Sequence, residues 1–420
     1  MAALRTALVA AGGAAALVAA LAAAPAQSAA ATCGGVPATI VGTAGDDTLI
    51  GTPGDDVVAA LDGADRIDAG GGNDLVCGDE GPDHLTGGPG GDRLYGGTNG
   101  LVPELESPPE AWGDTVAPGP GDDLVDLGAN TVLRTDGSYA SDALDYSASG
   151  TGVAVDLAAG TATGEGTDTI VLGLPATAGS VQLLGSTHSD VLRGTEADDA
   201  ILGKGGGDRV EGRGGDDAIA NDVDPYEYEP LPGELADDVF DGGPGNDTVD
   251  SNGGSDVLFG GPGRDTVRKA RGPATIDGGP GADRLEVRLG PGRHTVSGGA
   301  GRDSIDLDVA VAGGPARGVL DHARGRFVVR LPSRVPVRAA MRQVERVTMP
   351  SQPGRWTYLG TRGDDRVAGG AAYTARGRGG DDLLRGSYDD DVLLGGPGRD
   401  RVVGKRGEDR CRAERVVSCE

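Results

Sequence analysis

An aspartate returns every nine residues near the start of this chain. Residues 42–95 divide into six windows with aspartate at position six and an apolar residue at position eight: GTAGDDTLI, GTPGDDVVA, ALDGADRID, AGGGNDLVC, GDEGPDHLT and GGPGGDRLY. A helix face does not repeat at nine residues, and a three-residue strand is not stable alone. The period therefore predicts a small turn-and-strand unit that becomes ordered only when copies of it stack.

The abundance of glycine limits what can hold such units together. The chain has 420 residues, of which 78 are glycine and only 3% are aromatic. Ordering the backbone costs about 1–2 kcal/mol per residue, and glycine adds to that cost. The glycines keep no three-residue period, which excludes collagen. The chain is therefore either disordered or ordered by something besides a bulky core.

The charge is large and unevenly distributed. The formal net charge is −28; residues 1–260 hold 8 Lys and Arg against 44 Asp and Glu, whereas residues 261–420 hold 29 against 21. An acidic surface repels nucleic acid and anionic membranes and concentrates cations. We therefore expect no nucleic-acid partner and no stable membrane insertion. An acidic chain is often simply solvated and disordered, but here the carboxylates are in register.

The register of the aspartates predicts bound cations. If two units make one coil, position six recurs on the same flank every 18 residues, so Asp47 and Asp65 belong to one ladder and Asp56 and Asp74 to the other. Carboxylates stacked about 4.8 Å apart repel one another unless a cation lies between them. Calcium takes about 6–8 oxygen ligands in loose geometry, whereas magnesium demands a tighter octahedron. Zinc prefers His or Cys ligands, which these turns lack.

Calcium bound in many copies is therefore the predicted cofactor, and its binding would be coupled to folding. The candidate calcium ligands are the aspartates at position six: Asp47, Asp56, Asp65, Asp74, Asp83, Asp92, Asp123, Asp190, Asp199, Asp208, Asp217, Asp247, Asp256, Asp265, Asp283, Asp303, Asp365, Asp382, Asp391 and Asp400.

Windows such as GGPGGDRLY, GGPGNDTVD and GGPGRDTVR resemble the nonapeptide of RTX, or haemolysin-type, calcium-binding repeat proteins. The resemblance implies an all-β fold, a right-handed parallel β-roll with calcium between adjacent turns. The ending GEDRCRAERVVSCE and the flanking cysteines resemble secreted actinobacterial members of that family. Many members carry a toxin, protease or lipase beside the roll, and this sequence shows no such partner.

The period also divides the chain. We expect a signal peptide at 1–31, calcium-binding arrays at 32–126, 185–306 and 359–420, and irregular β spacers at 127–184 and 307–358, the second rich in arginine. Alternating residues around Val153–Leu157 and the stretch RGRFVVRL predict strands. The stretch RAAMRQVERV at 338–347 predicts a short helix.

The register predicts where calcium binding ends on each flank. Past Asp238, position six on that flank is Asp256, then Ala274, then His294; the other flank keeps Asp247, Asp265, Asp283 and Asp303. We therefore expect calcium sites to end near Asp256 on the first flank and to continue to about Asp303 on the second. We interpret His294 as a turn residue in a metal-free part rather than as a catalytic or transition-metal ligand.

The N-terminus and the cysteines predict export. Arg5 followed by the apolar stretch 7–24 and small residues is typical of a signal peptide, with cleavage expected between residues 26 and 31. An uncleaved membrane anchor is the alternative. In an oxidising compartment the simplest pairing of the four cysteines is Cys33–Cys77 and Cys411–Cys419. We expect a secreted protein, extracellular or at the cell surface.

No catalytic motif stands out. The sequence contains neither HExxH nor GxSxG, and position five of the windows is interpreted as solvent-facing charge. The leading hypothesis is a secreted, non-enzymatic calcium-binding protein. The alternatives are a calcium-dependent adhesin or cell-wall scaffold, with cell-wall polysaccharide or a surface protein as partner, and a relative of glycan-processing enzymes. Trp112, Tyr226 and Tyr228 in two insertions, and the arginines of 307–358, are candidate contacts for such a partner.

Overall fold

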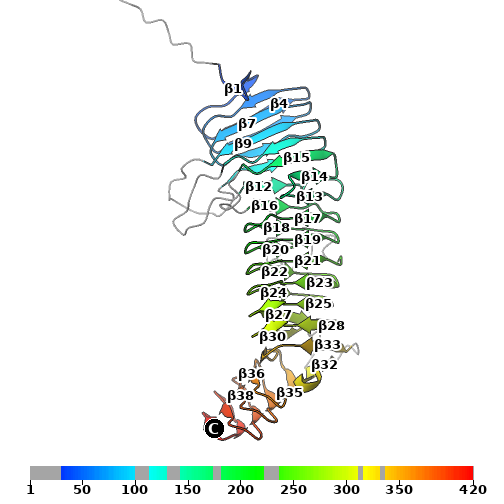
Figure 1. Ribbon diagram of the computed structural model, residues 1–420, viewed down its shortest axis with the longest axis vertical. Helices are drawn as coiled ribbons and strands as arrows, with labels where there is room; N and C mark the ends of the chain where they lie inside the picture. Colours follow the sequence, from blue (N-terminus) through cyan, green and yellow to red (C-terminus); the bar gives the residue numbers. More distant parts are fainter. Residues whose placement is uncertain are drawn as a thin grey trace, which may run out of the picture.

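The chain winds into a long coil whose turns contribute short strands to two facing sheets (Figure 1). This computed structural model describes residues 30–99, 113–129, 142–173, 181–221, 236–310, 316–331 and 336–419. The predicted signal segment up to residue 29, and Trp112, Tyr226 and Tyr228, lie outside the described residues. The two sheets run through all three periodic arrays, so the arrays share one solenoid.

The first sheet, sheet I, is parallel throughout. Its strands, in spatial order, are β4 (Thr48–Thr52), β6 (Arg66–Gly70), β8 (His84–Thr86), β10 (Thr115–Ala117), β12 (Asp142–Asp145), β16 (Val181–Leu184), β18 (Ala200–Leu202), β20 (Ala218–Ala220), β22 (Thr248–Ser251), β24 (Thr266–Lys269), β27 (Arg284–Leu289), β30 (Ser304–Val309), β34 (Arg346–Thr348), β36 (Arg366–Ala368), β38 (Leu383–Arg385), β40 (Arg401–Val403) and β42 (Arg415–Val417).

The second sheet, sheet II, is parallel except at two places. Its strands, in spatial order, are β3 (Ile40–Val41), β5 (Val57–Ala59), β7 (Leu75–Glu80), β9 (Arg93–Thr98), β11 (Leu124–Asp126), β15 (Thr167–Val171), β14 (Thr161–Thr163), β13 (Ala154–Asp156), β17 (Val191–Arg193), β19 (Arg209–Glu211), β21 (Val239–Asp241), β23 (Asp256–Phe259), β25 (Ala274–Asp277), β28 (Gly292–Ser297), β33 (Val337–Arg342), β32 (Arg326–Arg330), β31 (Ala316–Asp321), β35 (Gly354–Leu359), β37 (Tyr373–Arg376), β39 (Val392–Leu394) and β41 (Arg410–Arg412).

Four short strands and one helical turn complete the described structure. They are β1 (Thr32–Cys33), antiparallel to β2 (Val36–Pro37); β26 (Pro280–Gly281), parallel to β29 (Ala300–Gly301); and the 3₁₀ turn η1 (His322–Arg324).

The 18-residue coil follows from the register of the strands. Leu49 of β4 pairs with Ile67 of β6, and Val58 of β5 pairs with Val76 of β7. The position-eight side chains point inward, and Val58, Ile67 and Val76 are buried. Burying such a side chain stabilises by about 1.5–3 kcal/mol, but each turn contributes only one per sheet. The predicted all-β parallel roll is confirmed, and its core is a thin apolar column.

The two aperiodic spacers have the same topology. In the first, the chain passes from β11 through β12 to a three-stranded antiparallel meander, β13–β14–β15, whose last strand pairs with β11. In the second, it passes from β28 through β30 to the meander β31–β32–β33, whose last strand pairs with β28. Each meander therefore inserts into sheet II without interrupting sheet I.

The helix expected over RAAMRQVERV is wrong. Residues 337–342 form β33, and 346–348 form β34. Burial alternates along β33 with a period of two residues, because the strand is paired on both sides with β28 and β32. Tertiary pairing outweighs the helix propensity of Ala, Arg and Met. The strands expected around 153–157 and in RGRFVVRL are confirmed as β13 and β32.

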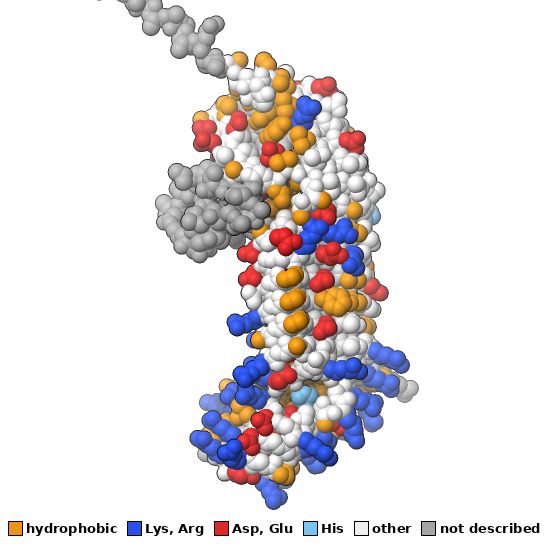
Figure 2. Space-filling view, in the orientation of Figure 1, with side chains coloured by type: hydrophobic (Ala, Val, Ile, Leu, Met, Phe, Trp, Pro, Cys, Tyr) orange, Lys and Arg blue, Asp and Glu red, His pale blue; other side chains and the backbone are white. Residues whose placement is uncertain are grey.

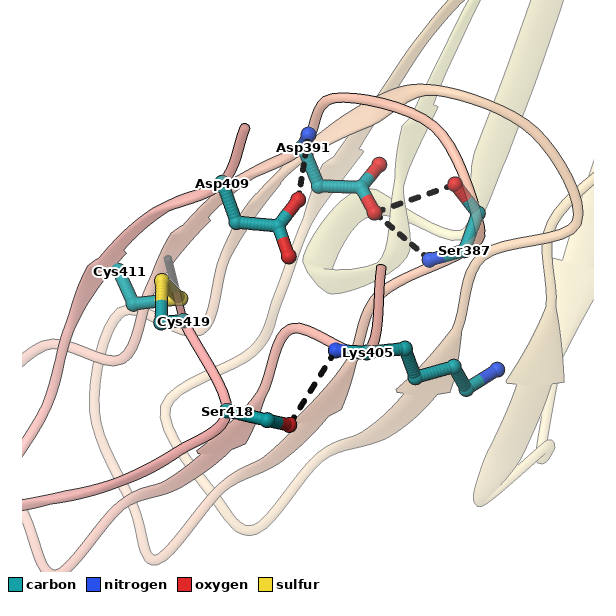
Figure 3. Close-up of a disulfide and its surroundings, with 7 residues drawn as sticks. All are labelled: Ser387, Asp391, Lys405, Asp409, Cys411, Ser418 and Cys419. Atoms are coloured by element: carbon teal, nitrogen blue, oxygen red, sulfur yellow. Dashed lines mark hydrogen bonds between the residues drawn. A yellow bond between two sulfur atoms is a disulfide. The ribbon is translucent and has the colours of Figure 1, made fainter. Parts of the chain in front are cut away.

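Disulfides are present at both ends of the roll. Cys33 of β1 is bonded to Cys77 of β7, and Cys411 of β41 is bonded to Cys419 beyond β42. Both expected pairings are confirmed. The first holds the β1–β2 hairpin at the first coil, and the second ties the C-terminal segment to the last one (Figure 3).

Candidate metal-binding ladders

The position-six aspartates form two ladders, one along each flank of the roll. Flank I contains those at the start of sheet I strands: Asp47, Asp65, Asp83, Asp114, Asp142, Asp199, Asp217, Asp247, Asp265, Asp283, Asp303, Asp365, Asp382 and Asp400. Flank II contains those at the start of sheet II strands: Asp56, Asp74, Asp92, Asp123, Asp168, Asp190, Asp208, Asp238, Asp256, Asp391 and Asp409.

In most rungs one carboxylate oxygen is used to join neighbouring coils. The backbone N–H of Asp47 donates to Oδ1 of Asp65 at 2.7 Å, and that of Asp56 donates to Oδ1 of Asp74 at 2.8 Å. The same bond recurs along both flanks at 2.7–3.2 Å. Because a glycine-rich turn has few other partners, this bond fixes the spacing of the carboxylates.

The second carboxylate oxygen has no hydrogen-bond partner in most rungs. Buried Oδ2 atoms without a partner occur in Asp65, Asp74, Asp83, Asp92, Asp114, Asp123, Asp208, Asp217, Asp247, Asp265, Asp283, Asp303, Asp382, Asp400 and Asp409. A buried polar atom without a partner costs about 1–3 kcal/mol, and more when it is charged. Because this cost recurs in coil after coil, it indicates that the ladders bind cations.

The environment of the ladders disfavours bare carboxylates. Burial raises the pKa of Asp114, Asp208 and Asp217 to about 8, and that of Asp83 and Asp265 to about 7. In each of these rungs the backbone hydrogen bond opposes the shift, and the neighbouring carboxylates add to it. Without a cation, such rungs hold a proton near neutral pH; a divalent cation replaces the proton.

The turns also offer backbone oxygens to a cation. A methyl group added to Gly242 would lie 2.5 Å from both Asp247 Oδ2 and the carbonyl oxygen of Gly260 in the next coil. Within the described part of the chain, no three Asp, Glu, His or Cys side chains converge on one point. A metal here must therefore combine a carboxylate with carbonyl oxygens, which is the ligand chemistry of calcium.

A comparison with protein families agrees with this chemistry. The model of the RTX calcium-binding nonapeptide repeat matches residues 41–76, 78–99, 184–219, 232–267 and 376–411. The chain therefore carries RTX calcium-binding repeats. The matched segments lie in the three periodic arrays, and this match together with the ladder geometry makes the protein a calcium-binding β-roll.

Other comparisons add little. A solved structure titled "X-ray crystal structure of a hyperactive, Ca2+-dependent, beta-helical antifreeze protein from an Antarctic bacterium" is 14% identical, over 86% of this chain and 82% of that one, with a TM-score of 0.21. At that TM-score the likeness carries no argument. No curated protein matches the chain. Among the residues that the structure describes, no helix is long and apolar enough to cross a membrane.

The RTX ladders include all 20 aspartates predicted from the sequence and five more. Asp114 and Asp238 resume the register after an insertion, and Asp409 is position six of the window GKRGEDRCR, so the period alone marks them. Asp142 and Asp168 lie in the first spacer, where no nine-residue period exists. The structure places them on the ladders, where each accepts a backbone N–H from the previous coil.

Six rungs satisfy the second oxygen within their own RTX turn. In these rungs position two is Thr or Ser, and its backbone N–H donates to Oδ2 at 2.5–2.7 Å while its hydroxyl donates to the same carboxylate. Figure 3 shows one such turn, with both donors of Ser387 on Asp391, beside Asp409, whose second oxygen has no donor. The six are Asp47, Asp56, Asp190, Asp199, Asp365 and Asp391.

Flank II contains one rung neutralised by the chain itself. Lys269 Nζ lies 2.6 Å from Asp256 Oδ2, with both side chains fully buried, and also donates to the carbonyl oxygen of Gly253. The hydroxyl of Ser251 donates to the same Oδ2. Ser251 and Lys269 stand at position one of two windows that begin 18 residues apart, one coil from each other, where glycine is usual. Burial lowers the pKa of Lys269, and the charge of Asp256 opposes that shift.

Position five is more than solvent-facing charge. Its aspartates are exposed, but Oδ1 of Asp46 accepts the backbone N–H of Ala64 at 3.0 Å, and Oδ1 of Asp198 accepts that of Asp216 at 2.7 Å. The same bond recurs in all three arrays. The interpretation of position five as solvent-facing charge is confirmed by this exposure, and the hydrogen bonds add a second role: an outer row of carboxylates also joins neighbouring coils.

Proposed function

We propose that the protein is a secreted, non-enzymatic calcium-binding protein whose roll assembles when extracellular calcium enters the two ladders. The observation that carries the proposal is the repeated buried Oδ2 atom without a partner. The apolar core is thin, so the cost of these carboxylates is large relative to what each coil gains from packing. Calcium supplies the absent charge, and its binding energy becomes folding energy.

The direct test is circular dichroism of the mature chain during a calcium titration after chelation. We expect a β signal that is weak in chelator, rises cooperatively with calcium and is not restored by the same concentration of magnesium, which tolerates only a tight octahedron. Extracellular calcium modules often bind at about 10⁻⁴–10⁻³ M, so a midpoint in that range supports folding after export. A full β signal in excess chelator contradicts the proposal.

The disulfides support an extracellular location. Both pairs are formed, and within the described residues no cysteine is free. Such bonds persist mainly in oxidising compartments. Fractionation of the producing cells, followed by mass spectrometry of the mature N-terminus, tests export and locates the cleavage site.

The non-enzymatic role is supported by how the histidines are used. His188 is exposed, His294 Nε2 lies 3.1 Å from the carbonyl oxygen of Gly290, and His322 Nδ1 lies 2.8 Å from the hydroxyl of Tyr358 and 3.2 Å from Asp365 Oδ1. His294 and His322 both line a cavity beside η1, but their hydrogen-bond partners are a backbone carbonyl, a tyrosine hydroxyl and a ladder carboxylate rather than a Ser or Cys nucleophile. Assays of hydrolysis and epimerisation on polysaccharides, with and without calcium, test this; calcium-dependent turnover would contradict it.

A second candidate function is adhesion through the arginine-rich meander. Arg330, Arg317 and Arg355 stand opposite one another across β32, β31 and β35, and Arg293 stands opposite Arg338 across β28 and β33. All five are exposed, and among the described residues none forms an ion pair with an acidic side chain. Like charges directly opposite across strands are destabilising, so this face is suited to an anionic cell-wall polysaccharide. Figure 2 shows Lys and Arg gathered on this half of the roll.

The adhesion candidate has its own test. Replacing Arg317, Arg330 and Arg355 by Gln is expected to abolish calcium-dependent sedimentation with cell-wall material and to leave the calcium titration unchanged. Replacing Arg66 and Arg93, which lie in the N-terminal array, is the matched control. Deleting insertions 98–113 and 221–237 asks whether those loops are the contact instead.

A further inference from the structure

The turns of the ladders adopt two conformations. In open turns the residue at position two has a positive φ and Oδ2 of the aspartate has no donor. In closed turns a Thr or Ser at position two donates its backbone N–H to Oδ2. In the turns of 14 of the rungs with a partnerless Oδ2, the residue at position two has a positive φ. These position-two residues are Leu61, Gly70, Asp79, Gly88, Gly119, Lys204, Arg213, Gly243, Gly261, Gly279, Gly299, Arg378, Gly396 and Lys405. In the six turns with Thr or Ser at position two, φ is not positive; the backbone N–H donates to Oδ2 and the hydroxyl donates to the same carboxylate.

The left-handed conformation has a cost when position two is not glycine. Leu61, Lys204 and Arg378 have φ of 80°, 63° and 79°. A residue with a Cβ in this region is disfavoured by roughly 1–2 kcal/mol, and such strain persists where it is of use. In the open turns the position-two N–H does not reach the carboxylate: that of Gly243, for example, donates to the carbonyl oxygen of Gly260 in the next coil, and Oδ2 of Asp247 receives no donor.

Position four changes with position two. In the open turns it is commonly a glycine with positive φ, as at Gly206 (113°) and Gly245 (157°). In the closed turns it includes His188, Ala197 and Asp389, none of which has a positive φ. The two forms are therefore distinct backbone structures rather than one turn with different side chains.

The closed turns occupy one kind of place. They provide the first aspartate on each flank of each array: Asp47 and Asp56 at the start, Asp190 and Asp199 after the first meander, and Asp365 and Asp391 after the second. At these places the preceding coil has no ladder aspartate: Asp190 follows Val153, Asp199 follows Val181, and Asp391 follows Tyr373. A first rung thus uses donors from its own turn.

We propose that position two decides which turns bind calcium, and that each ladder begins with a metal-independent capping turn closed by Thr or Ser. This rests on the proposed function, because it presumes that open turns bind calcium. It narrows the ligand set predicted from the sequence: Oδ2 of Asp47, Asp56, Asp190, Asp199, Asp365 and Asp391 is not a calcium ligand. The capping turns provide a formed edge on which the first calcium-dependent coil is built.

Crystals of the full mature chain grown with calcium test this site by site. Anomalous scattering should show calcium at open turns, such as those of Asp217 and Asp265. No peak should lie within ligand distance, about 2.6 Å, of Oδ2 in any of the six capping turns; one peak there overturns the inference. A protein that holds no calcium anywhere instead refutes the proposed function, so the two failures are distinguishable.

Substitutions at position two test the same rule in solution. Lys204→Thr introduces the capping donor beside Asp208, while Gly206 at position four permits either backbone form. We expect it to lower the calcium bound at saturation by about one ion per chain, measured by elemental analysis after dialysis. Lys204→Gly, which keeps the open form, should bind as many ions as the parent. Equal loss, or no loss, in both variants contradicts the rule.

The reverse change converts a cap into an open turn. Thr195→Gly combined with Ala197→Gly removes the hydroxyl donor from Asp199 and permits positive φ at both positions, which allows the backbone N–H of position two to turn away from Oδ2. We expect this variant to bind about one additional ion per chain, and Thr195→Ser, which keeps both donors, to bind none. Hydrogen exchange of β18 reports whether the converted turn remains folded; a folded variant with unchanged stoichiometry overturns the inference.

Discussion

The two flanks of the roll differ most between residues 238 and 303. On flank I, Asp247, Asp265, Asp283 and Asp303 succeed one another, each with a buried oxygen that lacks a partner. On flank II the ladder stops at Asp256, whose second oxygen accepts hydrogen bonds from the ammonium group of Lys269 and the hydroxyl of Ser251. The buried carboxylates of the same coils are therefore neutralised in two ways: flank I offers its free oxygens to a metal cation, whereas on flank II a lysine of the chain is the cation.

The residues beyond Asp256 on flank II explain how the ladder can end. Ala274 and His294 take the next two places in register, so no further buried carboxylate needs neutralising. The core then widens, with Phe327, Trp356 and Tyr358 fully buried around the second meander. The expectation that calcium ends near Asp256 on this flank stays a prediction, and Lys269 gives it a physical reason. A roll can dispense with the metal where it has a larger apolar core.

Removing calcium should unfold the coils that depend on metal while the coils with a larger core stay folded, and this is the largest expected effect. In chelator at neutral pH, we expect amides of β20, β22 and β24 to exchange freely, because their coils depend on carboxylates that lack a counter-charge. Amides of β31–β33 and β35 should keep more protection, because a bulky core supports them. Hydrogen exchange with mass spectrometry resolves the two segments. Equal protection of both in chelator would remove the distinction between metal-dependent and core-dependent coils.

Much of this arrangement is visible in the sequence, and the reason is geometric. A nine-residue period fixes an 18-residue coil, so the rung neighbours of Asp47 or Asp265 are found by counting. Other features cannot be found by counting, because they depend on pairing between distant residues. Asp142 and Asp168 are on the ladders although their spacer has no period. Residues 338–342 form a strand because β28 and β32 flank them. Lys269 is recognisable in the sequence as a lysine at a position where glycine is usual, but its ion pair with Asp256 is evident only in the folded coil.

Acid should partly replace calcium on flank I. The pKa values of Asp265, about 7, and of Asp247 and Asp283, about 6, lie above the ordinary 3.8 because of burial. Between about pH 4 and the folded pKa, the folded state binds more protons than the unfolded state, so the metal-free roll loses stability as pH rises through this window. The slope is about 1.4 kcal/mol per pH unit for each proton.

The measurement is the β signal in chelator from about pH 8 to about pH 5. We expect it to rise as the pH falls, whereas in calcium the affinity for the metal should weaken over the same interval because protons compete for Oδ2. A β signal in chelator that falls with acid would show that the carboxylates are not the groups that limit folding.

On flank II the resident cation should matter with or without metal. Lys269→Met keeps most of the side-chain volume and removes the charge, which leaves Asp256 buried without its partner. Breaking a buried pair in this way costs about 3–5 kcal/mol, and we expect that loss in urea unfolding at low calcium. Lys269→Met combined with Asp256→Asn removes both charges and should recover most of it. If the single and double variants are equally destabilised, packing rather than charge accounts for the role of Lys269.

The smallest expected effect is that of Asp265→Asn, which should destabilise the roll in calcium and stabilise it in chelator. This change of sign distinguishes the two flanks most sharply. Asp265→Asn keeps an Oδ1 that accepts the backbone N–H of Asp247, a bond of 2.9 Å, but replaces Oδ2 by an amide nitrogen. In saturating calcium the variant loses a ligand, so its free energy of unfolding in urea should fall by about 1–2 kcal/mol. In chelator it loses a buried charge and gains a donor toward the nearby carbonyl oxygen of Gly278, so exchange of β24 should slow.

The matched change on flank II should show no such reversal. Asp256→Asn leaves Lys269 buried without an anion, so β23 should exchange faster in chelator and the urea midpoint should fall in calcium. The contrast has one cause: on flank I the counter-charge comes from solution and can be withdrawn, whereas on flank II it is covalently part of the fold. An Asp265→Asn variant that is destabilised in both media would place flank I in the same class as flank II.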